Sequence, residues 1–329
     1  MKRRNLLIAL GASALAAPFA SYAQQPAKVA RIGFLSSVSA SGYASRVEAL
    51  RAGLRDLGYV EGKNVVIEFR WAEGNYDRLP VLAAELVRLK VDVLVAQSTY
   101  GAHAARKATA TIPIVMVAVG DPVASGLVAS LAQPGANITG SASFAPELAA
   151  KRLELLKELI PRITQVAVLL NQENQDNVLT KPTLEAMERA AKLLKLGLQQ
   201  FSVRGPTEFE SAFAAIVKKR PGALAVFEES MININRKAIA ELAAKHRLPS
   251  IGNKDFAEAG GLIGYGVNFP ELYRRAAIVV DKILKGAKPG DIPVERATRF
   301  ELIANLNTAR SIGIKIPDWL LQRADKVIE

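Results

Sequence analysis

Short apolar runs rich in β-branched residues alternate with amphipathic helical segments along almost the whole chain. The runs from Val91 to Ala96 and from Ile112 to Val119 are nearly continuous examples. Apolar runs of about four to eight residues between helices are typical of parallel sheets that helices cover on both faces. Because strand–helix–strand crossovers are right-handed, such units wind into a doubly wound sheet. The sequence therefore predicts an α/β fold.

The alternation occurs in two arrays, as expected for a chain of 329 residues. The first array has predicted strands at Val29–Leu35, Val65–Trp71, Val91–Ala96 and Ile112–Val119. The second array has predicted strands at Val166–Leu170, Leu198–Val203, Ala223–Phe227, Pro249–Gly252 and Gly261–Gly266, and a last long helix at Leu272–Leu284.

We expect residues 24–143 to form one lobe and residues 144–286 the other, with the join near Ile138 to Pro146. The C-terminal segment, residues 287–329, is expected to return to the first lobe. Two Rossmann-like lobes would then enclose a hinged cleft at the carboxyl ends of their strands.

The N-terminus has the three-part layout of a secretory signal sequence. A basic start at residues 1–5 precedes an uncharged apolar stretch at residues 6–20. This stretch is shorter than the roughly 20 residues that span a bilayer, so we expect a signal peptide, residues 1–23, cleaved after Ala23, and not an anchor. The pair Arg3-Arg4 leaves the general secretory and twin-arginine routes both open. The mature chain is therefore predicted to lie in the periplasm.

Composition and charge exclude several kinds of site. The chain has no cysteine, which excludes a lipid anchor on an N-terminal cysteine, disulfides and thiol nucleophiles. Its formal net charge of +12 is interspersed with acidic residues and forms no dense basic run, so nucleic acid is not an expected partner. The two histidines, His103 and His246, lack zinc-ligand spacing, and no Gly-x-Ser-x-Gly, dinucleotide-binding or P-loop motif occurs. We therefore expect no catalytic residue, metal or cofactor.

Polar side chains follow several predicted strands, where they would meet at the cleft. The candidate ligand-binding residues are Ser36, Ser37, Ser98, Thr99, Tyr100, Asp121, Asn171, Glu228, Asn253 and Tyr265. Ser37, Ser98 and Thr99 stand where helices are expected to begin, and free N–H groups with the helix dipole favour a carboxylate there. Helix capping is the alternative for each hydroxyl, and both interpretations stay open. Asp121 or Glu228 is expected to accept hydrogen bonds from a ligand amine.

A series of segments, in order along the chain, resembles the ABC transporter substrate-binding protein family that includes bacterial tryptophan-type binding proteins. The matching segments are Arg31–Ser37, Leu57–Asn64, Glu68–Gly74, Ile112–Val115, Val119–Val123, Gly135–Gly140, Lys151–Lys157, Ala259–Leu262 and Ile316–Asp325. The resemblance implies a type I periplasmic-binding fold and an importer permease and ATPase as partners. Where the family carries a Gly-Thr-Pro-like turn, this chain has Thr99 followed by Tyr100. In the second lobe, Glu228-Glu229 replaces an Asp-Pro or Asp-Asn pair.

These features together predict a monomeric periplasmic solute-binding component of an ABC importer. Closure of the lobes would capture a small organic ligand, an amino acid or a related carboxylate. Two alternatives stay open. The same fold could report ligand occupancy to a membrane receptor as a sensor, or it could be a secreted enzyme.

Overall fold

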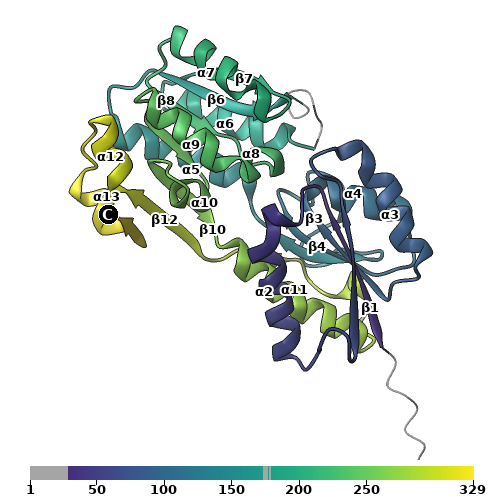
Figure 1. The fold of residues 1–329 in the computed structure, drawn as a ribbon. Coiled ribbons are helices and arrows are strands. Elements are labelled where there is room, and N and C mark those ends of the chain that lie inside the picture. The colour runs from purple at the N-terminus through teal and green to yellow at the C-terminus, as the bar shows by residue number, and fades with distance from the viewer. Residues whose placement is uncertain (1–28, 173–176, 178) are drawn as a thin grey trace, which may run out of the picture.

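The computed structural model describes residues 29–172, 177 and 179–329, so the predicted signal peptide at residues 1–23 lies outside the described part. The described residues form two α/β lobes, each built around one sheet with helices on both faces (Figure 1). The predicted fold class, two doubly wound sheets, is confirmed. Among the helices of the described residues, none combines the length and the apolar character needed to cross a membrane.

The first lobe contains a six-stranded, all-parallel sheet in the order β11-β5-β4-β3-β1-β2. Its strands are β1 (Ala30–Ser36), β2 (Val65–Trp71), β3 (Val93–Gln97), β4 (Ile114–Val119), β5 (Ile138–Ala142) and β11 (Glu295–Arg296). Its helices are α2 (Ala44–Asp56), α3 (Leu79–Arg88), α4 (Ser98–Ala108) and α11 (Phe269–Leu284), with 3-10 turns η1 (Ser41–Tyr43), η2 (Tyr76–Arg78) and η5 (Pro289–Asp291). Alternate residues of a strand point to opposite faces, so Val93 and Val95 pack with α2 and α11 whereas Leu94 and Ala96 pack with α3 and α4. This two-sided burial explains the continuous apolar runs in the sequence.

The second lobe contains a seven-stranded sheet in the order β13-β12-β10-β9-β8-β6-β7. Its strands are β6 (Gln165–Asn171), β7 (Gly197–Val203), β8 (Ala223–Val226), β9 (Ser250–Gly252), β10 (Ile263–Val267), β12 (Phe300–Asn305) and β13 (Lys326–Ile328). Its helices are α5 (Ala145–Leu159), α6 (Lys181–Leu193), α7 (Phe209–Lys218), α8 (Ser230–Ile234), α9 (Arg236–Lys245), α10 (Lys254–Glu258), α12 (Leu306–Ile312) and α13 (Asp318–Arg323), with a 3-10 turn η4 (Pro206–Glu208). The pairing is parallel except between β10 and β12, which run antiparallel.

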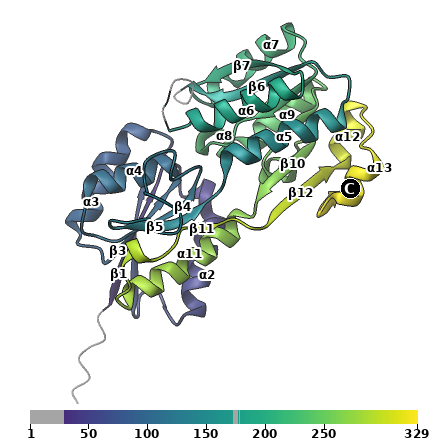
Figure 2. The same ribbon diagram turned by 180° about the vertical axis from the view of Figure 1, so that it is seen from behind.

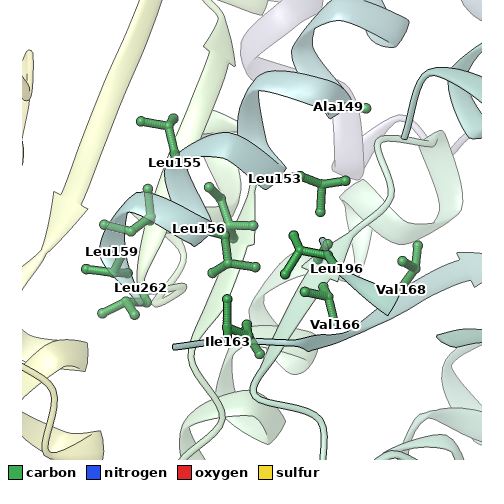
Figure 3. Packing of buried hydrophobic residues seen from close by; sticks show 14 of the residues in the cluster. Ala149, Leu153, Leu155, Leu156, Leu159, Ile163, Val166, Val168, Leu196 and Leu262 are labelled. Carbon is green, nitrogen blue, oxygen red and sulfur yellow. The ribbon is translucent and has the colours of Figure 1, made fainter. Parts of the chain in front are cut away.

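Buried aliphatic side chains hold α5 and α6 against the second sheet. Figure 3 shows Leu153 and Leu156 of α5 above Val166 and Val168 of β6, and all four side chains are no more than 1% exposed. The opposite face of the same sheet is covered by α7 and α9, whose apolar residues include Phe213, which is fully buried. The sheet is therefore a rigid platform for the loops at its carboxyl edge.

Within the described residues the chain passes between the lobes three times, from β5 to α5, from β10 to α11, and from β11 to β12 (Figure 2). At the first crossing Phe144 has a φ of 57°, in the left-handed region. Three short connections between two lobes are an arrangement about which two rigid bodies can rotate.

Three placements differ from the sequence-based expectation. The helix expected at Leu272–Leu284 in the second lobe is α11, and it packs against α2 of the first lobe in both views (Figures 1 and 2). The two helices bury their apolar faces in one cluster, and Gly53 of α2 permits a close approach, since an added Cβ would lie 2.4 Å from the carbonyl oxygen of Arg274. Of residues 287–329, only β11 pairs with the first sheet, and β12 and β13 extend the second. The join expected near Ile138 to Pro146 does contain the crossing from β5 to α5, but β5 itself was not predicted, because its small and polar residues carry no strong apolar signal.

Candidate ligand-binding site

A cavity lies where the carboxyl ends of the two sheets face each other. In each sheet the strand order reverses between the first and third strands, at β1 and β3 and at β6 and β8, and such switch points are where open α/β sheets bind ligands. The cavity contains about 690 Å³ of space free of protein atoms, part of it open to solvent. Lining residues come from both lobes, and those with functional side chains include Tyr43, Arg46, Gln97, Ser98, Thr99, Tyr100, Phe227, Glu228, Glu229, Ser230, Asn233 and Phe269. Ser98, Thr99, Tyr100 and Glu228 belong to the predicted set, and their contact with a ligand stays a prediction.

The N-terminus of α4 forms one wall of the cavity. The hydroxyl of Ser98 accepts a hydrogen bond from the backbone N–H of Gly101 at 3.3 Å, and that of Thr99 accepts one from Gly120 at 3.3 Å. Each hydroxyl therefore retains its O–H as a donor for an acceptor in the cavity. Ser98 also has a φ of 67°, a strained backbone for a residue with a side chain, and such outliers gather at binding sites. Hydroxyl donors at the start of an eleven-residue helix suit a carboxylate.

Gln97, the last residue of β3, is a buried hydrogen-bonding centre that connects the lobes. Its Oε1 accepts hydrogen bonds from the hydroxyls of Ser36 at 3.4 Å and Ser37 at 2.9 Å, and from the Ser37 N–H at 3.2 Å. Because donors occupy this oxygen, the amide nitrogen is directed the other way, and it donates to Tyr43 Oη at 3.0 Å and to Ser230 Oγ at 3.2 Å. Ser36 and Ser37 are fully buried behind Gln97 and do not line the cavity. They orient the side chain that bridges to α8.

Aromatic rings supply the apolar part of the wall. Tyr100 stacks on Tyr76 with ring centroids 4.5 Å apart and planes at 1°, so Tyr76 holds the Tyr100 ring in place from behind. Phe227 at the end of β8, Phe269 at the start of α11 and Tyr43 line the same cavity. Rings on several sides favour a ligand with a flat apolar body.

Arg46 of α2 is a buried cation between two aromatic rings. Its guanidinium carbon lies 4.3 Å from the centroid of Tyr43 and 4.3 Å from that of Phe269. Its Nη2 donates to Oδ2 of Asp255 in α10 at 2.8 Å, which makes a second bridge between the lobes. Burial alone would lower the pKa of Arg46, but Tyr43, Asp255 and Tyr273 together raise it above its ordinary value. The side chain therefore stays charged.

Two adjacent carboxyl groups line the second-lobe side of the cavity and have different partners. Glu228 forms a buried ion pair with Arg152, whose Nε also donates to the carbonyl of Tyr265 at 2.7 Å. Glu229 caps α8 by accepting hydrogen bonds from the N–H groups of Met231 and Ile232. Burial raises the pKa of Glu229 to about 7, although these N–H groups partly oppose the shift. Its charge therefore changes near neutral pH.

The remaining predicted residues do not line the cavity. Asp121 accepts hydrogen bonds from the N–H groups of Val123 and Ala124 and caps a turn. Asn253 caps α10, and its amide nitrogen donates to Asn233, which does line the cavity. These short polar side chains bind the backbone that follows them, the usual competitor of a ligand at such positions.

Asn171 and Tyr265 also lie outside the wall of the cavity. Asn171 is buried at the end of β6, and the ring of Tyr265 packs 6.1 Å from that of Phe300. Among the residues that the structure describes, no group of three or more His, Asp or Glu side chains is placed to hold a metal ion.

Gln97, Arg46 and Phe269 line the cavity but were not among the predicted site residues, and two of them carry a signal in the sequence. Gln97 is a lone amide at the end of an apolar strand, and Arg46 shares a helix face with Leu50 and Gly53 at a spacing of four and three residues. A charge or amide on a buried face needs a partner, so such positions mark polar networks. Phe269 had no local signal, because its role depends on α11 packing against the first lobe.

Comparisons with known proteins agree with this arrangement. The family model described as ABC transporter substrate binding protein matches residues 31–328. A tyrosine-binding protein of Clostridioides difficile (strain R20291) is similar to this chain, at 30% identity over 263 residues, which cover 80% of this chain and 74% of that protein.

Two solved structures differ in how closely their overall shapes match that of this chain. An ABC domain in complex with L-Trp from Streptococcus pneumonia is 27% identical, with 91% of this chain and 99% of that chain covered and a TM-score of 0.82. The ligand-free, open structure of a substrate binding protein with adhesive properties from Clostridium difficile is 26% identical at the same coverages, with a TM-score of 0.66. Since identity and coverage are nearly equal, the difference in TM-score lies in the shape of the chain, which is more similar to the L-Trp complex.

Proposed function

Because this chain belongs to the ABC transporter substrate binding protein family, we propose that it captures an aromatic L-amino acid between its lobes and presents it to the permease of an importer. The family and the related structures are substrate-binding proteins and not enzymes, so binding is the activity to explain. The observation that carries the ligand class is the cavity, which combines hydroxyl donors, carboxylates and aromatic rings.

The polarity of the cavity fits a zwitterion. On the first lobe, Ser98 and Thr99 offer O–H donors at the start of α4, which suits the carboxylate of an amino acid. On the second lobe, Glu228 and Glu229 offer oxygen atoms to an ammonium group. Tyr100 and Phe227 lie with them in the wall, where an aromatic side chain can stack. The tyrosine-binding relative and the L-Trp complex support the same class.

Closure of the lobes is the proposed binding step. The hydrogen bond from Gln97 to Ser230 and the ion pair from Arg46 to Asp255 join the two lobes beside the cavity. A ligand that contacts both lobes shifts an open–closed equilibrium toward the closed state by its extra affinity for that state. The higher TM-score with the L-Trp complex than with the open structure supports a closed arrangement here.

The partners and the location follow from the same proposal. The signal peptide predicted at residues 1–23 would export the chain to the periplasm, where a monomer would meet the permease of an ATPase-driven importer. A ligand sensor coupled to a membrane receptor would present the same lobes. Uptake of radiolabelled ligand by cells with and without this chain distinguishes the two, because only the transport component is needed for uptake.

Calorimetric titration and thermal unfolding test the ligand class directly. The chain is titrated with L-Trp, L-Tyr, L-Phe, L-Leu and D-Trp. An aromatic L-amino acid at about one hundred times its Kd should stabilise the protein by about 2.7 kcal/mol. Thr99→Val should weaken binding, whereas Asp121→Ala, outside the cavity, serves as the matched control and should leave it unchanged. Absence of stabilisation by every aromatic amino acid would refute the proposal.

A further inference from the structure

Arg46 is the one cationic side chain among the described residues that line the cavity. Its side chain is 5% exposed, so its charge is almost entirely removed from bulk solvent. The other arginine near the site, Arg152, is committed to Glu228 and to the carbonyl of Tyr265. Among the described residues, Arg46 is therefore the one positively charged side chain on the cavity wall that an anionic group of a ligand can meet.

The stacking on Arg46 restricts where the guanidinium can bind. The guanidinium carbon lies over the rings of Tyr43 and Phe269, 4.3 Å from each centroid, so these two contacts are made by ring faces and use none of the N–H donors in hydrogen bonds. The five N–H donors of arginine all lie in the guanidinium plane. Within the described part of the chain, this guanidinium makes one hydrogen bond, to Asp255. Its remaining donors are in-plane N–H groups of a buried side chain on the cavity wall.

We propose that Arg46 binds the carboxylate of the ligand through these in-plane N–H groups while Asp255 holds another part of the guanidinium from the second lobe. Arg46 is then a specificity-determining residue that recognises the anionic group and couples its binding to closure. This inference rests on the proposed function and assigns the carboxylate a charged partner in addition to the hydroxyls of Ser98 and Thr99. Charge-assisted hydrogen bonds of this kind are about twice as strong as neutral ones.

A carboxylate-binding role for Arg46 and a purely structural role as a bridge between the lobes predict different effects on ligand affinity. A residue that only joined the lobes would stabilise closure around any ligand, whatever groups the ligand carries. A residue that binds the carboxylate distinguishes ligands that carry this group from ligands that lack it. Pairs of ligands with the same ring and amine but with and without a carboxylate therefore test the proposal.

The experiment is calorimetric titration of the mature chain with L-Trp and tryptamine, and with L-Tyr and tyramine. The wild type should bind the amino acid at least about 100-fold more tightly than the amine. Arg46→Gln should weaken binding of the amino acid by about 10- to 100-fold and change binding of the amine far less. The ratio of the affinity for the amino acid to the affinity for the amine should therefore fall. Arg46→Lys, which keeps the charge without the planar fork, should give an intermediate ratio. Asp255→Asn should weaken both ligands by a similar factor and preserve the ratio.

Arg274→Gln, an exposed arginine of α11 paired with Asp56, is the matched control for the lost charge and should leave both affinities unchanged. Far-UV circular dichroism and the Tm establish that each variant is folded, and Arg46→Lys carries the test if Arg46→Gln does not fold. An unchanged ratio in folded Arg46 variants overturns this inference and leaves the proposed function standing. If the wild type binds the amine and the amino acid with equal affinity, this inference is also overturned and the proposed function still stands. Failure of the wild type to bind any aromatic amino acid overturns both.

Discussion

Replacing Glu229 by glutamine should remove a pH-dependent loss of stability from the second lobe. Glu229 is 9% exposed, and burial raises the pKa of its carboxyl group from the ordinary 4.5 to about 7. The N–H groups of Met231 and Ile232 favour the ionised form, but they do not outweigh the cost of burying the charge. Between pH 4.5 and about pH 7, Glu229 therefore keeps its proton in the folded protein, whereas in the unfolded chain it has already released it.

The sign and size follow from linkage. Because the pKa is higher in the folded state, the folded protein binds more protons between pH 4.5 and pH 7, and the free energy of unfolding falls as pH rises through this window. The shift from 4.5 to about 7 is about 2.5 units, and each unit corresponds to about 1.36 kcal/mol. Ionisation of Glu229 should therefore cost on the order of 3 kcal/mol above pH 7. Glutamine keeps an oxygen acceptor for Met231 and cannot ionise.

Urea unfolding from pH 4 to pH 8, followed by circular dichroism, measures this effect. The stability of Glu229→Gln relative to wild type should increase by about 3 kcal/mol as pH rises through the window. Glu210→Gln, an exposed carboxylate of α7, is the control for loss of one charge and should show no comparable rise. If the difference between Glu229→Gln and wild type is independent of pH, burial does not control this carboxyl group and the reasoning is wrong.

Arg152→Met should lower the free energy of unfolding by about 3–5 kcal/mol in urea, because it leaves the buried Glu228 carboxylate unpaired, and Glu228→Gln added to it should restore part of the loss. Unchanged stability of the single variant would contradict the buried pair. Gly140→Ala should cost about 3 kcal/mol or more, read as a lower Tm, because the new Cβ would lie 1.9 Å from the Met116 carbonyl oxygen at a φ of +138°. Leu156→Ala should cost about 2–5 kcal/mol in urea unfolding by opening a cavity under α5, and a change below 1 kcal/mol would argue against the tight packing in Figure 3.

Local periodicity was enough to predict most elements. The strand at Val65–Trp71 has the predicted bounds, because it consists of a clear apolar pattern with a distinct start and end. The strand Ile138–Ala142 was missed, since its residues Thr139, Gly140 and Ser141 carry no apolar alternation. Its place in the sheet comes from pairing with β4 and β11, which no local pattern reports.

The candidate site was predicted in part for the same reason. Residues after β3 reach the cavity because a parallel sheet brings the carboxyl ends of its strands to one edge. The prediction could not distinguish a cavity-lining side chain such as Thr99 from a turn cap such as Asp121. Both are short polar residues after a strand, and only their hydrogen-bond partners differ.

The sequence alone determined the α/β class, the two arrays and the family, because these depend on patterns within a few residues and on motifs along the chain. The tertiary structure decided that α11 joins the first lobe, that β12 and β13 extend the second sheet, and that Arg46 meets Asp255 across 209 residues of chain. The role of a buried charge such as Arg46 depends on the partner that the fold places beside it. Because that partner lies far away in the chain, no pattern of neighbouring residues in the sequence identifies it.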